Sequence, residues 1–251
     1  CIISGGTNEG VRKRLENLGL TDIYLGAHNK INQYNELLEK YNLKCFWFVY
    51  SSVFEGKIGK LEKIIITSRD PAPPPLRLLK KSGTIFKDMM IHDFDLARFY
   101  LNKDEFNFVF ATGSNISDKR IYKYKDFELA TCVMRSKKGV QCIITNSRHC
   151  SFGYDQRVEL FGNKGMIISD NKRNLETTLY SRKSTNIKKP LMYFFIERYD
   201  EAYKLQLNDL VKLIKNNSKP LANFEDGRRS LILAEGAIKS IKSKKFEKIK
   251  F

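Results

Sequence analysis

Asp88 and His92 are the residues whose types and spacing best suit catalysis. They lie four positions apart within residues 83–99, and on a helix residues at this spacing share a face. The Asp88 carboxylate would then orient the imidazole of His92 or tune its basicity. Such a pair predicts a general acid/base that moves the proton of a hydroxyl group. The alternative is structural: Asp88 caps the helix, and His92 packs against a sheet with its polar atoms satisfied.

Residues 56–251 must supply the elements that position this pair. Short alternating strands come first and long helices follow, an order typical of an α+β domain whose mixed or antiparallel sheet carries its helices on one face. Three consecutive prolines exclude a helix interior, so we expect residues 68–75 to form an extended loop. The expected strands are 64–67, 108–111, 128–135, 140–147, 156–161 and 166–169, and the expected helices are 86–102, 193–215 and 226–243. Residues 248–249 are expected to form a final strand or a tail.

Residues 1–44 have a different pattern. Apolar strands at 1–3 and 23–25 alternate with helical spacing at 11–18 and 31–41, which predicts a partial β-α-β-α segment of a parallel sheet. The apolar residues 45–55 fit neither part. We therefore expect three parts: a partial α/β segment at 1–44, a junction at 45–55 and a folded domain at 56–251.

Composition excludes several classes of protein. The chain has 251 residues, 42% of them hydrophobic and 12% aromatic, which is globular despite a formal net charge of +17. Lysines are spread along the chain without interleaved aromatics, so we expect a solvated surface and no nucleic-acid partner. No stretch approaches the roughly 18 to 20 apolar residues of a membrane-spanning helix, and no signal peptide is visible. Five scattered cysteines without C-x-x-C spacing predict reduced thiols, no metal site and a cytoplasmic location.

Several motifs in residues 56–251 resemble one known domain. That domain is the C-terminal domain of the inositol 2-dehydrogenases, members of the glucose-fructose oxidoreductase/inositol dehydrogenase/rhizopine catabolism superfamily. The motifs are G-K-I-G-K at 56–60, T-S-R-D-P-A-P-P-P at 67–75, S-G-T-I-F-K-D-M-M-I-H-D-F-D-L-A-R-F at 82–99, N-S-R at 146–148, F-G-Y-D-Q-R-V-E-L-F-G at 152–162, F-I-E-R-Y at 195–199 and D-G-R at 226–228.

The resemblance implies a site for a cyclic polyol such as myo-inositol. In this family His92 would take the hydroxyl proton as hydride leaves for NAD, with Asp88 beside it as orienter and substrate ligand. Tyr154, Asp70 and Arg69 would contact substrate hydroxyls. Taken alone, an aromatic in an F-G-Y turn such as Tyr154 is better explained by packing than by ligand binding. The resemblance also implies a homo-oligomer formed through the sheet face.

The sequence departs from the family where the cofactor should bind. No G-x-G-x-x-G follows a strand, and the family's Glu-Lys-Pro motif is absent, so we expect the NAD-binding domain to be missing from this chain. A nucleotide-binding partner domain would then have to supply it. Smaller departures are Thr84, where the family usually has a second glycine, and Phe152, where it often has tyrosine. The alternative function is a non-catalytic remnant or a sugar-binding module.

Residues 1–44 resemble a haloacid-dehalogenase-type phosphatase of the 3-deoxy-manno-octulosonate 8-phosphate phosphatase branch. The resemblance implies that Ser4 and Lys30 bind phosphate, although the nucleophilic aspartate and the acidic magnesium ligands of that family are absent. An ordinary turn at Ser4 and a solvated lysine at Lys30 are the alternatives. A phosphatase is therefore the third hypothesis. The matching runs are I-I-S-G-G at 2–6, V-R-K-R-L at 11–15, L-G-L-T-D-I-Y-L-G at 18–26, N-K at 29–30 and L-L at 37–38.

Overall fold

The chain divides into two compact units, Cys1–Glu55 and Gly56–Phe251. A computed structural model describes residues 2–3, 9, 13, 23–24, 53, 55–217, 219–220 and 222–251. In the first unit, β1 (Ile2–Ile3) pairs in parallel with β2 (Ile23–Tyr24). The helices expected in residues 1–44, and nearly all of the expected junction, lie outside the described residues.

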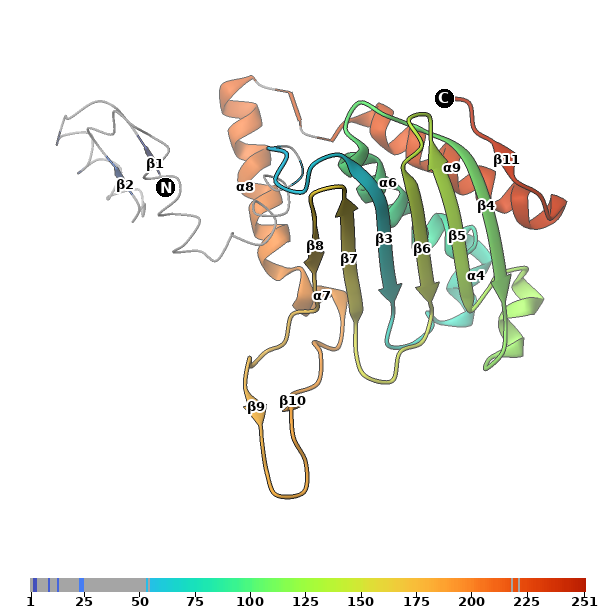
Figure 1. Cartoon of the computed structure of the whole chain (residues 1–251), viewed down its shortest axis with the longest axis horizontal. Coiled ribbons are helices and arrows are strands. Elements are labelled where there is room, and N and C mark those ends of the chain that lie inside the picture. Colours follow the sequence, from blue (N-terminus) through green and yellow to red (C-terminus); the bar gives the residue numbers. More distant parts are fainter. Residues whose placement is uncertain are drawn as a thin grey trace. The chain divides into compact units, whose positions relative to one another are not determined.

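The second unit is built on a seven-stranded sheet with the order β11-β4-β5-β6-β3-β7-β8 (Figure 1). Only β3 and β6 are parallel neighbours, because every other adjacent pair in this sheet is antiparallel. The expected α+β fold with a mostly antiparallel sheet is therefore confirmed. The strands are β3 (Leu61–Arg69), β4 (Phe106–Ser114), β5 (Leu129–Ser136), β6 (Gln141–Ser147), β7 (Asp155–Gly162), β8 (Gly165–Ser169) and β11 (Glu247–Lys248).

Alternation along β3 separates the two faces of this sheet. Ile64, Ile66 and Ser68 are buried on the face that packs against α6 (Met90–Leu101), whereas the side chains between them point to the opposite face. The helix α9 (Phe224–Ser243) packs beside α6 on the same side, and Figure 1 shows both helices behind the sheet. Ser68, near the end of β3, is the first polar residue of this buried row, and it lines the cavity described below.

The helices differ from expectation at three places. The expected helix 86–102 is interrupted at Met89, which separates α5 (Ile85–Asp88) from α6. The expected helix 193–215 divides at Tyr199 into α7 (Phe195–Arg198) and α8 (Asp200–Asn216). The proline loop leads directly into an unexpected helix, α4 (Leu76–Ser82). Pro75 precedes its first turn, a position where a missing backbone N–H costs nothing.

The remaining elements are a 3-10 helix at Lys119–Tyr124 and a hairpin of β9 (Thr178–Leu179) and β10 (Ile187–Lys188).

The hydrophobic core lies between the sheet and the helices α5, α6 and α9. Ile64, Phe86 and Phe94 are fully buried there. Cys132, Cys142 and Cys150 are buried free thiols, as the sequence predicts for these three positions. Within the described part of the chain, no helix combines the length and hydrophobicity needed to cross a membrane, and no cluster of three metal-ligating side chains occurs.

Candidate functional site

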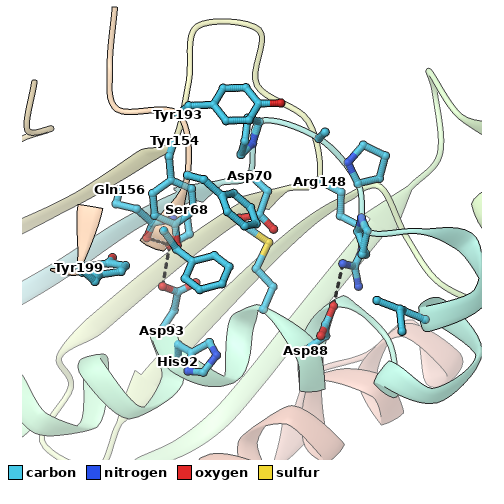
Figure 2. A pocket seen from close by; sticks show the side chains of 18 of the residues that line it. Ser68, Asp70, Asp88, His92, Asp93, Arg148, Tyr154, Gln156, Tyr193 and Tyr199 are labelled. Carbon is cyan, nitrogen blue, oxygen red and sulfur yellow. Dashed lines mark hydrogen bonds and ion pairs between the residues drawn. The ribbon is translucent and has the colours of Figure 1, made fainter. Parts of the chain in front are cut away.

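A cavity of about 1000 Å³ opens where β3 ends beside the first turn of α6. Its floor is the end of the sheet, and aromatic residues from the segment that leads into α8 lie over it (Figure 2). The apolar part of the wall comes from the proline loop 71–75 and from Met89. Polar side chains line the rest: Ser68, Asp70, Asp88, His92, Asp93, Arg148, Tyr154, Gln156, Tyr193 and Tyr199.

His92 lies in the first turn of α6, and its side chain is exposed toward this cavity. Its backbone N–H donates to the Met89 carbonyl at 3.3 Å, a contact that closes the turn after the helix break. The imidazole makes no hydrogen bond or ion pair with another described residue, and Figure 2 shows it below Asp93 without a partner. The ring nitrogens are therefore available to a ligand.

Asp88 ends α5 and does not pair with His92 as the sequence suggested. The helix break at Met89 removes the continuous helix on which the expected contact depended. Instead, Arg148 Nη1 donates to Asp88 Oδ2 at 2.8 Å (Figure 2). Asp88 and His92 still line the same cavity, so both face a ligand bound there.

Asp70 follows β3 on the helix-side face and also lines the cavity. Burial raises its pKa to about 6. The positive charge of Arg148 opposes this shift, and the negative charge of Asp88 adds to it. A carboxyl group with this pKa is mostly ionised at neutral pH and accepts hydrogen bonds from hydroxyl groups.

Asp93 is a buried carboxylate that ties α6 to three strands. Asp93 Oδ1 lies 2.7 Å from Ser68 Oγ on β3, and Asp93 Oδ2 accepts from Asn146 Nδ2 on β6 at 2.7 Å. Ser68 Oγ is also 2.9 Å from Gln156 Oε1 on β7. Burial raises the Asp93 pKa to about 6, although the Asn146 and Ser68 hydrogen bonds counteract it. This network fixes the start of α6, and hence His92, over the end of the sheet.

Tyr154 both packs and lines the cavity, so the two sequence interpretations describe the same side chain. Its ring meets Phe194 and Tyr199 edge to face, with centroids 6.5 and 6.0 Å apart. Its hydroxyl hydrogen bonds to Tyr199, and burial raises its pKa. Tyr154 therefore stays protonated and can donate or accept one hydrogen bond.

Arg69 lies outside the cavity, contrary to the expected contact with substrate. Strand alternation turns its side chain to the opposite sheet face, where Arg69 Nη1 donates to Asp155 Oδ2 at 2.7 Å. Asp155 is fully buried and also accepts from Arg157 Nε at 2.8 Å. Arg69 thus belongs to an ion-pair cluster on the other face of the sheet.

Several cavity residues were not singled out from the sequence. Arg148 and Gln156 belong to motifs quoted above, but nothing in their spacing shows that they meet Asp88 and Ser68. Strand register places these residues near the site. Ser68 pairs with Gln156 on one side and with Asn146, two positions before Arg148, on the other. Register becomes visible only once the sheet order is known.

The comparisons with known proteins agree with this fold. Residues 49–168 match the model of the GFO/IDH/MocA C-terminal domain. The Myo-inositol 2-dehydrogenase of Thermotoga maritima is 43% identical over 198 residues, which cover 79% of this chain and 59% of that protein. The resemblance of residues 56–251 to the C-terminal domain of inositol 2-dehydrogenases is therefore confirmed.

Solved structures of inositol dehydrogenases share the fold of this chain. A myo-inositol dehydrogenase from Corynebacterium glutamicum superimposes with a TM-score of 0.79 at 36% identity, covering 91% of this chain and 65% of that one. The scyllo-inositol dehydrogenase of Lactobacillus casei, solved with bound cofactor NAD(H) and scyllo-inositol, shares the fold at 24% identity and a TM-score of 0.73, covering 96% of this chain and 68% of that one. The chain spans about three fifths of the length of the Thermotoga maritima protein.

The phosphatase resemblance has no such support. Ser4 and Lys30 lie outside the described residues, so the structure assigns neither of them a position. The relatives named above are all inositol dehydrogenases.

Proposed function

We propose that this chain supplies the substrate site of an NAD-dependent inositol 2-dehydrogenase, with a cyclic polyol such as myo-inositol as substrate. The observation that carries the proposal is the cavity itself. It presents an unpaired imidazole beside three carboxylate side chains, in a chain 43% identical to a Myo-inositol 2-dehydrogenase. The three carboxylates are those of Asp70, Asp88 and Asp93.

The lining suits a ring that carries a hydroxyl on every carbon. Each hydroxyl can donate one hydrogen bond, and the carboxylates of Asp70 and Asp88 accept such bonds. The hydroxyl of Tyr154 supplies a complementary donor. Met89 and the proline loop offer apolar contact to the faces of the ring. We assign recognition of the polyol to these residues.

His92 is the general base of the proposed reaction. Its ring takes the proton from the hydroxyl oxygen of the carbon that is oxidised, and the same carbon loses hydride to give a ketone. Because the imidazole has no side-chain partner among the described residues, a ring nitrogen is free to accept the hydroxyl proton. Asp88 acts in this proposal as a substrate ligand rather than as the orienter of His92.

The described residues do not fit the pyrophosphate of NAD. Within Gly56–Phe251 no G-x-G-x-x-G turn leads from a strand into a helix, the arrangement that holds a dinucleotide. A nucleotide-binding domain is therefore the proposed partner of this unit. The proposal also includes a homo-oligomer formed through the open sheet face, and a cytoplasmic location, which suits the buried reduced thiols.

Isothermal titration of the chain with myo-inositol, scyllo-inositol and the linear polyol sorbitol tests the proposal. We expect the cyclic polyols to bind and sorbitol to bind at least about tenfold more weakly, because a flexible chain must be ordered on binding. Absence of measurable heat with every cyclic polyol would contradict the substrate assignment. Binding without NADH formation after a dinucleotide-binding domain is fused to the chain would favour the sugar-binding module.

A further inference from the structure

Arg148 lies between two carboxylates at the back of the cavity. Its side chain is 1% exposed, although it carries a full positive charge. Arg148 Nη1 donates to Asp88 Oδ2 at 2.8 Å, and Arg148 Nη2 donates to Asp126 Oδ2 at 2.9 Å. The planar guanidinium therefore spans the two acids and fixes the distance between them.

Asp126 fixes the same site from a second direction. Its side chain is fully buried, and its Oδ1 accepts the backbone N–H of Ile85 at 2.6 Å and that of Phe127 at 2.8 Å. Ile85 is the first residue of α5, and Asp88 is the last. One carboxylate thus holds the beginning of α5 through its backbone, and holds the end of α5 through Arg148.

We propose that Arg148 is a positioning residue for Asp88, and that Asp126 positions Arg148, so that Asp88 Oδ1 is aimed at a polyol hydroxyl. Arg148 engages only Asp88 Oδ2, which leaves Oδ1 of this cavity-lining side chain without a hydrogen-bond partner among the described residues. The inference rests on the proposed function, because it assigns a geometric role within that site.

The energetics favour a positioning role over a stabilising one. Arg148 Nε is buried and has no hydrogen-bond partner in the described structure, so the group is desolvated without full compensation. Buried ion pairs of this kind are often no more stable than apolar replacements of similar size, but removing one member leaves an unpaired buried charge. Complete removal of the Arg148 side chain would leave the buried Asp126 carboxylate without its ion-pair partner, so a charge-conserving variant is more informative.

Arg148→Lys keeps the charge but replaces the planar fork with a single ammonium group. That group cannot hold both acids in the present geometry. Arg98→Lys is the matched control, because Arg98 is also buried and pairs with Glu105 at 2.9 Å, but it does not line the cavity. Both variants lose a buried arginine ion pair, so their melting temperatures should fall by similar amounts.

Titration of the chain with myo-inositol should separate the two variants. We expect Arg148→Lys to weaken the affinity at least about tenfold, and Arg98→Lys to leave it within about twofold. Asp126→Asn, which removes the charge but keeps the size of the side chain, should change affinity in the same direction as Arg148→Lys. Equal affinities in Arg148→Lys and Arg98→Lys would overturn the inference.

A second measurement is independent of the polyol. Arginine side-chain nitrogen NMR should show Arg148 with separate, slowly exchanging Nη–H signals, because a guanidinium held at both ends cannot rotate freely. Asp88→Asn should merge these signals. If the chain binds no cyclic polyol, the proposed function is wrong, but these spectra still test the pairing of Arg148 with Asp88. If the signals do not respond to Asp88→Asn, the positioning role is wrong even where the polyol binds.

Discussion

Asp70 is a carboxyl group whose ionisation should control polyol binding. Burial raises its pKa to about 6, and only the ionised form accepts hydrogen bonds at both oxygens. Because the proton is bound below this pKa, we expect affinity for myo-inositol to fall by up to about tenfold between pH 7 and pH 5. Calorimetric titration across this range measures the effect.

Two variants separate Asp70 from the other groups that face it. Asp70→Asn should flatten the pH profile. Asp93→Asn should keep most of the slope, although the Asp93 pKa is also raised to about 6, because Ser68 and Asn146 occupy the oxygens of Asp93. An unchanged slope in Asp70→Asn would contradict the assignment of the pH dependence to Asp70.

His92 should contribute to the rate and little to binding. In a chimera that joins the chain to a dinucleotide-binding domain, we expect His92→Ala to lower kcat about 10²- to 10⁴-fold, the usual contribution of a positioned acid/base. His149→Ala is the control, because His149 Nδ1 lies 2.8 Å from Glu128 Oε1 and does not line the cavity. A kcat within about threefold of the parent for His92→Ala, or equal losses for both variants, would restore the structural interpretation of His92.

Individual cavity residues could be predicted from the sequence when they carry recognisable chemistry. Asp88, His92, Asp70 and Tyr154 all line the cavity, and their types and motifs pointed to them. Arg69 does not line the cavity, because successive residues of a strand point to opposite faces of the sheet. Arg148 pairs with Asp88 across 60 positions of sequence, a distance over which spacing carries no information.

Thr84 is a strained residue at the beginning of α5. Its φ of 80° and ψ of 164° fall in a region that is essentially restricted to glycine, and its hydroxyl is buried without a partner among the described residues. Replacement by glycine removes the backbone strain and the buried unpaired hydroxyl. We expect this gain in free energy to exceed the entropic cost of glycine's greater conformational freedom in the unfolded chain. We therefore expect Thr84→Gly to stabilise the protein by about 1–2 kcal/mol, within the range of such strain costs.

Thermal unfolding measures this change, and a gain of about 2–4 °C in Tm per kcal/mol is usual at this size. Thr112→Gly is the control, because Thr112 is an exposed residue of β4 without positive φ. It should lower Tm, since glycine weakens a strand. A lower Tm for Thr84→Gly would show that the threonine is accommodated without strain.

Elements were easier to predict than their interruptions. The strands follow from alternation, but the breaks at Met89 and Tyr199 leave hydrophobic periodicity almost unchanged. The helix break changes the proposed site, because Asp88 pairs with Arg148 and His92 lies on a separate turn. The helix α4 was missed because the proline run that precedes it was read as a loop alone.

At the scale of the whole molecule, the face of the sheet opposite α6 and α9 carries an apolar row in addition to the ion pairs of Asp155 with Arg69 and Arg157. Phe110, Val133, Ile143 and Ile65 pair across four neighbouring strands in one row of this face. Phe161 and Ile168 extend it and are 43% and 53% exposed. Exposed apolar surface of this kind marks an interaction site or becomes an aggregation liability. The sequence predicted its occupant to be a second copy of the chain.

A charge placed on this face should therefore dissociate the oligomer. We expect the parent chain to sediment as a homo-oligomer and Val133→Glu to sediment as a monomer, because Val133 lies in the middle of the apolar row and a carboxylate there would be desolvated without a partner. Ile116→Glu is the matched control: Ile116 is 70% exposed in the loop after β4, so the same charge should leave the mass unchanged. Sedimentation velocity at several concentrations measures both. A monomeric parent, or a Val133→Glu variant of unchanged mass, would rule out the open face as the contact between copies and leave its apolar row to another partner.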